Sequence, residues 1–277
     1  MHHWTSLDRL KAAAYGLVSE DRKTDTAVIF VHGFLGDARG TWLNFQEMID
    51  SYVLRFPHWS TADAYFFSYE SFLQSITDSA EELLSFTHKI FPKPPGWLFS
   101  VPAVIRHIPG FSLIALKKRT YKRLILVGHS EGAVVIRRAI VVAYKRTGGK
   151  DPILGANLAL FAPAHLGFTP SGWLGACLAL GKVEELTMTI LGFSPSFTEM
   201  RDKTLLHQIQ QDTAELRRQA PNVAAFEARV LFGLKDYVVV KAEYTWDKPD
   251  PPDLGQDHVS VCKPRTGYVK PLEFVIR

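Results

Sequence analysis

The chain has 277 residues, of which 47% are hydrophobic and 22% are charged, and its formal net charge is +4. This composition is ordinary for a soluble globular protein and argues against a mainly disordered chain. Two cysteines, Cys177 and Cys262, are too few for a disulfide framework, and the first residues lack the apolar core of a signal peptide. We therefore expect a cytoplasmic protein that forms a single domain over residues 1–277.

The order of apolar runs along the chain predicts an α/β fold. A short helix is expected over residues 8–19. Apolar residues at three- and four-residue steps predict two further helices, around 73–84 and 133–143. Five short apolar runs predict buried parallel strands at residues 26–31, 64–69, 123–127, 157–161 and 229–234. Such alternation favours a mostly parallel central sheet flanked by helices on both faces.

Two stretches interrupt this alternation. Residues 91–120 are rich in proline and aromatic residues, and residues 164–220 join an apolar part to a polar helix over about 198–219. Insertions at these places are expected near the carboxyl ends of the strands, where open α/β sheets bind ligands. We interpret both as lid or cap insertions. The alternative is that they only cover the sheet.

The basic residues and one apolar stretch raise the question of a membrane surface. Residues 96–116 come nearest to a membrane span, but they contain Arg106 and two prolines, which favours a lid or a surface-lying segment. Basic residues cluster over 117–123 and 137–146. They form either a solvated face or a patch that attracts anionic lipid head groups. No nucleic-acid motif accompanies them, so nucleic acid is not an expected partner. The oligomeric state is not predicted.

The motif with the clearest chemistry is Gly128-His129-Ser130-Glu131-Gly132. A bare G-x-S-x-G match is a weak signal. Here a predicted strand leads directly into it and a predicted helix leads directly out, which is the setting of a nucleophile elbow. The glycines allow a tight turn, and the helix N-terminus favours developing negative charge near Ser130. We predict that Ser130 is a nucleophile.

A second loop supplies candidates for the oxyanion hole. Acyl transfer through a tetrahedral oxyanion needs two aimed N–H donors. One is expected from the backbone of Glu131, and the other from the backbone of Phe34 in the loop Val31–Gly36. His32 is interpreted as a structural residue of this loop. Leu35 is a candidate for the substrate pocket.

The base and the acid are expected downstream, in the order serine, acid, histidine. Asp236 follows the strand predicted to end at Leu234, and His258 is the last histidine of the chain. We predict that His258 is the base and that Asp236 orients it. His165 follows a strand end and is a further pocket candidate. The aspartates of the proline-rich loop, at 247, 250 and 253, are expected to be solvated. No metal-binding or dinucleotide-binding spacing is found, so neither a metal nor a cofactor is expected.

These motifs resemble the lipase-like serine esterases related to glycosylphosphatidylinositol inositol-deacylases and to serine-active-site lipid-remodelling proteins. The matching pieces are Val31–Gly36 with Thr41-Trp42, Ile125–Ser130, and Asp257–Pro264. The resemblance implies an α/β-hydrolase core and a Ser130–Asp236–His258 triad that acts on acyl esters. The family elbow usually runs Gly-x-Ser-Leu-Gly-Gly, and here Glu131 and Ala133 stand at two of those positions. An ionised Glu131 would repel an anionic substrate.

The sequence therefore predicts a serine hydrolase that cleaves small-molecule or lipid esters with a hydrophobic acyl group through an acyl-enzyme. A thioesterase or an acyltransferase would use the same residues. Two alternatives of another class stay open. One is a non-catalytic binding protein of the same fold. The other is a peripheral membrane protein that uses its basic and apolar surface.

Overall fold

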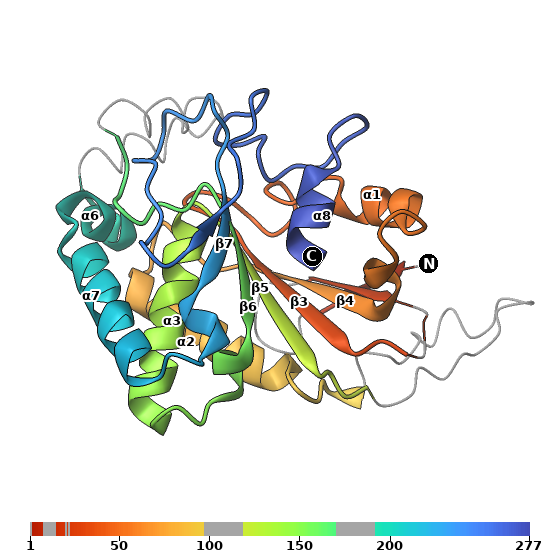
Figure 1. Ribbon diagram of the computed structural model, residues 1–277, viewed down its shortest axis with the longest axis horizontal. Helices are drawn as coiled ribbons and strands as arrows, with labels where there is room; N and C mark the ends of the chain where they lie inside the picture. Colours follow the sequence, from red (N-terminus) through yellow and green to blue (C-terminus); the bar gives the residue numbers. More distant parts are fainter. Residues whose placement is uncertain (1, 8–14, 20, 22, 97–118, 170–191) are drawn as a thin grey trace, which may run out of the picture.

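The computed structural model describes residues 1–277 except 1, 8–14, 20, 22, 97–118 and 170–191. An eight-stranded sheet in the order β1-β2-β4-β3-β5-β6-β7-β8 runs through the centre of the described part (Figure 1). Its strands are β1 His2–Ser6, β2 Tyr15–Ser19, β3 Thr26–Val31, β4 Ala62–Phe67, β5 Arg123–His129, β6 Asn157–Phe161, β7 Ala228–Leu231 and β8 Lys248–Pro249.

The sheet is parallel from β4 to β8, and β1 and β2 join its edge in antiparallel pairing. In the central register, Val31 of β3 lies opposite Gly128 of β5, which in turn lies opposite Leu160 of β6. Because parallel strands end at the same edge, this register brings the loops after β3, β5 and β6 together. That carboxyl edge carries the loops with the predicted site residues.

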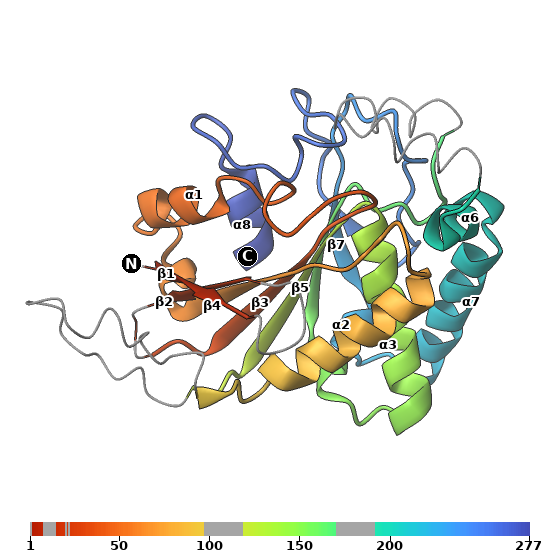
Figure 2. The same ribbon diagram turned by 180° about the vertical axis from the view of Figure 1, so that it is seen from behind.

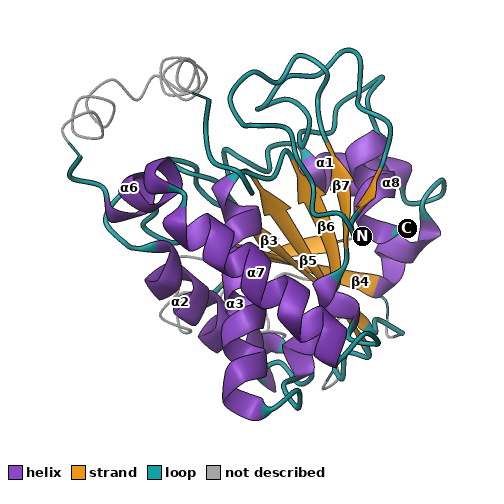
Figure 3. Ribbon diagram, turned by 60° about the vertical axis from the view of Figure 1, so that its left-hand side comes forward, coloured by secondary structure: helices purple, strands orange, loops and turns teal. Residues whose placement is uncertain are grey.

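Helices cover both faces of the sheet. The helices α1 Phe45–Tyr52 and α8 Lys270–Ile276 contact each other on one face, and α8 also contacts β5. On the other face α2 Ile76–Ile90 packs against α3 Glu131–Thr147, which in turn contacts α7 Thr204–Gln219 (Figures 2 and 3). The short helix α6 Pro195–Asp202 contacts α2 and α7. Three 3-10 helices complete the described elements, at Pro57–Thr61, Pro152–Gly155 and Ala224–Phe226.

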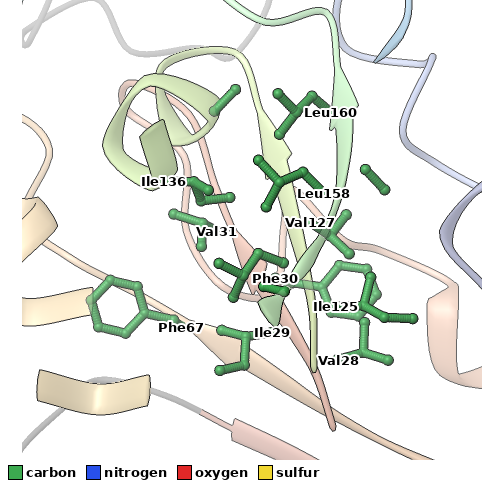
Figure 4. Close-up of a cluster of buried hydrophobic side chains, with 14 of the residues drawn as sticks. Val28, Ile29, Phe30, Val31, Phe67, Ile125, Val127, Ile136, Leu158 and Leu160 are labelled. Carbon is green, nitrogen blue, oxygen red and sulfur yellow. The ribbon is translucent and has the colours of Figure 1, made fainter. Parts of the chain in front are cut away.

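Local chemistry explains where α2 begins and where α3 ends. The hydroxyl of Ser75 caps α2 by accepting a hydrogen bond from the backbone N–H of Asp78 at 3.0 Å. Gly148 ends α3 in the left-handed conformation, with φ of 61°. Between the helices and the sheet lies a core of branched and aromatic side chains from β3, β5, β6 and α3 (Figure 4). Every residue of β3 and of β4 is buried, as expected for strands covered on both faces.

The predicted α/β fold is confirmed, and all five predicted strands exist with shifts of a few residues at their ends. The helix predicted over 8–19 is wrong for its described part, because Tyr15–Ser19 is strand β2. Antiparallel pairing of β2 with β1 on one side and β4 on the other outweighs the weak helical periodicity of these residues. The polar helix predicted over 198–219 consists of α6 and α7, separated at Lys203, whose φ is 62°.

Most of the first predicted insertion, at residues 97–118, lies outside the described residues, as do residues 170–191 of the second. The described ends of the first one lie at the amino-terminal edge of the sheet. Tyr121 N–H donates to Pro92 O at 2.8 Å, and Lys122 N–H donates to Asp25 O at 2.7 Å, directly before β3. Placing this insertion at the carboxyl edge was therefore wrong for its described ends, because α2 runs back across the sheet before it. In the second insertion, α7 covers α3, whereas α6 lies beside the loop after β4.

Candidate active site

Ser130 stands alone between strand β5, which ends at His129, and helix α3, which begins at Glu131. Its φ of 55° and ψ of −122° lie in a region that residues with a side chain rarely adopt. Two backbone hydrogen bonds hold it there: Ser130 N–H donates to Phe161 O at 3.0 Å, and Ala164 N–H donates to Ser130 O at 3.2 Å. The end of β6 thus fixes the strained turn that carries the serine.

The glycines around Ser130 are required by close packing. A Cβ atom on Gly132 would lie 2.3 Å from the carbonyl oxygens of both Val31 and His32. A Cβ atom on Gly33 would lie 2.7 Å from the Cβ atom of Ser130. Distances this short do not occur between real atoms, so the loop after β3 and the serine turn approach each other only because these residues lack side chains.

The predicted serine, histidine and aspartate meet in one hydrogen-bonded chain. His258 Nε2 lies 3.1 Å from Ser130 Oγ, and His258 Nδ1 lies 2.9 Å from Asp236 Oδ2. All three side chains are buried. Both distances are within the range at which a histidine can take a proton from a serine while a carboxylate fixes its tautomer.

The surroundings of Asp236 favour its charged form. Burial alone would raise its pKa, but the hydrogen bond and charge of His258 and the N–H groups of Val238 and Val239 outweigh it and hold the pKa below its usual value. Val238 N–H donates to Asp236 Oδ1 at 2.9 Å. The carboxylate is therefore held by the turn that follows β7, and its second oxygen is left for the histidine.

His129, inside the serine motif, is a site residue that sequence reasoning missed. Its Nε2–H donates to the carbonyl oxygen of His258 at 2.8 Å, and the two rings lie 4.9 Å apart. Burial, with a smaller effect from the His258 charge, lowers the pKa of His129 to about 3, so its ring is neutral. The side chain thus ties the loop of His258 to the end of β5. The only sequence signal was its place in the motif.

The loop after β3 brings Gly33, the residue before Phe34, against Ser130. Neither Phe34 N–H nor Glu131 N–H has a hydrogen-bond acceptor among the described residues. His32 has a structural position: its Nδ1–H donates to Gly33 O at 2.9 Å, and its Nε2 accepts from Tyr69 N–H at 3.2 Å. Burial lowers the pKa of His32 to about 4, against the opposing effect of its bond to Gly33.

The Glu131 side chain does not lie on the surface of the site. It is fully buried, and the hydroxyl of Tyr69 lies 3.3 Å from its Oε1. Burial raises the pKa of Glu131 to about 8, although hydrogen bonds with Tyr69 and Ser196 oppose the rise. At pH 7 the carboxyl is mostly protonated. The negative charge that the sequence placed beside the nucleophile is therefore largely neutralised at pH 7.

Aromatic side chains gather beside Phe34. Its ring centroid lies 6.0 Å from that of Phe197, 6.3 Å from that of Phe168 and 6.5 Å from that of Phe72. Phe34, Phe72 and Phe168 are half-buried, so part of each ring remains accessible. Leu35 is buried and packs against Phe34 and Phe72. We call the four phenylalanines the phenylalanine cluster.

His165, which follows the end of β6, is buried. Its ring stacks on Tyr244 at 4.4 Å, and neither ring nitrogen has a hydrogen-bond partner. Burial and the neighbouring charge of Arg137 lower its pKa well below the usual value. Arg137, which is itself buried, pairs with Asp247 at 2.5 Å. The prediction that Asp247 is solvated is wrong, because it also accepts a hydrogen bond from Ala228 N–H at 2.9 Å.

Other chemistries find little support among the described residues. They contain no cluster of three or more histidines, cysteines or acidic residues that could hold a metal ion. Cys262 is buried, and burial raises the pKa of its thiol to about 12, so it is no nucleophile. In the same described ranges, no helix combines the length and the apolar character that a membrane span requires.

The mostly parallel sheet, the strand–serine–helix turn and the hydrogen-bonded serine, histidine and aspartate define an α/β-hydrolase fold. Residues 111–245 match the family described as "Putative serine esterase (DUF676)". This region is just under half of the chain and contains Ser130 and Asp236. The match confirms the predicted resemblance to lipase-like serine esterases. No curated protein matches the chain.

Solved structures of several hydrolases resemble the chain at low sequence identity. The esterase RhEst1 from Rhodococcus sp. ECU1013 is 13% identical, with a TM-score of 0.49, over 100% of this chain and 98% of that one. A monoacylglycerol lipase from Paleococcus ferrophilus is 14% identical, with a TM-score of 0.48, over 90% of this chain and 93% of that one. Phospholipase PlaB from Legionella pneumophila, in complex with thio-NAD, is 17% identical, with a TM-score of 0.48, over 76% of this chain. That match spans 38% of the Legionella chain.

Proposed function

We propose that the protein hydrolyses carboxylic esters through an acyl-enzyme, with Ser130 as the nucleophile, His258 as the general base and Asp236 as its orienting acid. The observation that carries this proposal is the continuous chain from Asp236 Oδ2 through His258 to Ser130 Oγ, with distances of 2.9 and 3.1 Å. The strained backbone of Ser130 supports it, because such strain clusters at functional sites.

In the proposed reaction, Ser130 Oγ attacks the ester carbonyl while His258 Nε2 takes its proton. The N–H groups of Phe34 and Glu131 hold the oxyanion. His258 then delivers the proton to the leaving alcohol, and the acyl group stays on the serine. A water molecule, deprotonated by the same nitrogen, attacks the acyl-enzyme. His258 then returns that proton to Ser130 Oγ as the bond from Oγ to the acyl group breaks and the acid is released. Asp236 stays ionised and stabilises the imidazolium in both half-reactions.

The phenylalanine cluster supports a hydrophobic acyl group as the substrate. Phe34 extends from the proposed oxyanion loop, and its neighbours Phe72, Phe168 and Phe197 surround it within 6.5 Å. An acyl chain placed against these rings would be removed from water, which favours binding by about 0.8 kcal/mol per buried CH2 group. Because Glu131 is mostly neutral at pH 7, it gives no reason to exclude an anionic lipid.

The same edge of the sheet supports contact with aggregated lipid. Large apolar side chains in the loops of this edge are exposed, namely Leu73, Phe193, Leu234, Tyr237 and Leu254. Single exposed apolar residues are normal on a protein surface, but several around one site favour an apolar partner. We include peripheral contact of a cytoplasmic protein with lipid surfaces in the proposal.

The test combines a covalent probe with a substrate panel. A fluorophosphonate probe should label the wild-type protein and the surface variant Ser51→Ala, but not Ser130→Ala. Hydrolysis of p-nitrophenyl esters should prefer longer acyl chains over acetate, and product analysis with added alcohol separates hydrolysis from acyl transfer. Absence of labelling in the folded wild type would favour the non-catalytic binding protein instead.

Lipid contact is tested separately by flotation with phosphatidylcholine vesicles, with and without phosphatidylserine. Wild-type protein should float with both kinds of vesicle. Replacing Leu234 and Tyr237 by serine should reduce flotation, because it removes exposed apolar area from the edge that carries Ser130. Flotation that responds only to phosphatidylserine and to salt would instead indicate binding through the basic residues.

A further inference from the structure

The first residue of α3, Glu131, carries a carboxyl group that the proposed reaction does not use. The side chain is fully buried, and its Oε1 lies 3.3 Å from the hydroxyl oxygen of Tyr69. The hydroxyl of Ser196, from α6, also faces the carboxyl. Its Oε2 atom has no hydrogen-bond partner among the described residues. A buried acid in this position needs a physical explanation.

The hydroxyl protons around Glu131 are already engaged. The Tyr69 hydroxyl donates to the carbonyl oxygen of His32 at 2.9 Å, a shorter contact than its 3.3 Å to Glu131. The Ser196 hydroxyl donates to the carbonyl oxygen of Ser71 at 2.6 Å. A hydroxyl has one proton to donate but two lone pairs to accept with. Both neighbours can therefore accept a hydrogen bond from a protonated Glu131, whereas a carboxylate has nothing to donate.

Tyr69 and its neighbours hold the loop that carries the proposed oxyanion donor. Besides the bond to the His32 carbonyl, Tyr69 N–H donates to His32 Nε2 at 3.2 Å. Two residues further on, the Ser71 hydroxyl accepts from Leu35 N–H at 2.9 Å. Phe34 lies between these two fixed points. The direction of its N–H thus depends on Tyr69 keeping its proton on the His32 carbonyl.

We propose that protonated Glu131 is a positioning residue for the oxyanion hole: its O–H donates to Tyr69, and Tyr69 then donates to His32. When Glu131 loses its proton, the Tyr69 hydroxyl keeps its own proton but turns its hydrogen bond from the His32 carbonyl to the carboxylate. The His32 carbonyl loses its donor, and the loop that aims Phe34 N–H loses one of the three hydrogen bonds that it makes with Tyr69 and Ser71. This inference rests on the proposed esterase function, and it deepens that function by making the oxyanion hole sensitive to alkaline pH.

The pH at which the change occurs follows from the groups that face Glu131. Burial raises the pKa of Glu131 to about 8, and the charge of Glu199 on α6 adds to the rise. His32 and Tyr69 do not titrate nearby, because burial lowers the pKa of His32 to about 4 and raises that of Tyr69 well above its usual value. Activity should therefore fall as the pH rises through 8.

The experiment is the pH dependence of kcat/KM for p-nitrophenyl butyrate, corrected for spontaneous hydrolysis, between pH 6 and 10. If only the protonated form is active, wild-type kcat/KM should fall about thirtyfold from pH 7 to 9.5, following the protonated fraction of a group with a pKa of about 8. In Glu131→Gln, the amide N–H replaces the acid O–H and does not ionise. The ratio of its rates at pH 9.5 and pH 7 should stay near one, whatever its absolute rate.

Two further variants keep the inference testable if Glu131→Gln folds poorly. Glu199→Gln removes a nearby negative charge, so the alkaline fall should move to lower pH. Tyr69→Phe removes the hydroxyl that links Glu131 to the His32 carbonyl, so kcat at pH 7 should fall more than KM changes. An alkaline fall that persists in Glu131→Gln and does not move in Glu199→Gln would overturn the inference while leaving the esterase proposal intact. A folded wild type that the fluorophosphonate probe does not label would overturn both.

Discussion

Replacing Glu131 by glutamine should make the protein more stable, and increasingly so as the pH rises. In the unfolded chain the carboxyl has a pKa near 4.5, whereas burial raises it to about 8 in the folded protein. The stabilising effect of this proton is complete below pH 4.5 and is lost progressively as the pH rises towards 8. At pH 7, about 2.5 pH units above the unfolded pKa, keeping the carboxyl protonated costs about 3 kcal/mol. A glutamine avoids this cost.

The assay is thermal unfolding of both proteins from pH 4 to 9. At pH 4 their melting temperatures should nearly coincide. At pH 7 the variant should melt about 6–12 °C higher, because 1 kcal/mol corresponds to about 2–4 °C in a domain of this size. Glu70→Gln, which replaces an exposed neighbour of Tyr69, should show no such divergence. A constant difference between Glu131→Gln and the wild type at every pH would refute the reasoning.

Three further substitutions test other parts of the site. His129→Phe keeps an aromatic ring but removes the donor to the His258 carbonyl, so kcat should fall about tenfold in steady-state kinetics, equivalent to about 1.4 kcal/mol; unchanged kcat would show that this bond positions nothing. Gly132→Ala introduces a Cβ atom 2.3 Å from two carbonyl oxygens and should lower the free energy of unfolding in urea by more than about 3 kcal/mol, whereas Gly155→Ala, with open space around it, should not. Arg137→Met leaves Asp247 buried without its cationic partner and should lower the free energy of unfolding by about 3–5 kcal/mol in the same assay. A loss below about 1 kcal/mol would contradict the buried ion pair.

Much of the fold was predictable because its signals are local. The runs over residues 26–31, 123–127 and 157–161 are short, apolar and rich in branched side chains, which suits strands buried on both faces. The strand at residues 15–19 escaped detection because it lies in the sheet between β1 and β4, and β4 is far from it in the sequence. Edge pairing of this kind depends on tertiary contact rather than on periodicity.

The serine, histidine and aspartate of the candidate site were also predictable, since chain order and strand ends indicate where each must lie. The residues that hold these three in place were not predictable from the sequence. Tyr69, Ser196 and His129 act through contacts that join distant parts of the chain, and no spacing in the sequence announces them. The same holds for the Arg137–Asp247 pair, in which an aspartate from a loop that looked solvated is drawn into the interior by a buried arginine.

The backbone strain at Ser130 lowers the stability of the folded protein. Holding a residue with a side chain at φ 55° and ψ −122° costs about 1–3 kcal/mol, and a glycine at the same place would avoid most of it. A chain selected only to fold or to bind would gain stability by giving up this serine. Its presence, in a turn that hydrogen bonds to the end of β6 fix and that closely packed glycines make possible, is the loss of stability that the proposed nucleophile would carry.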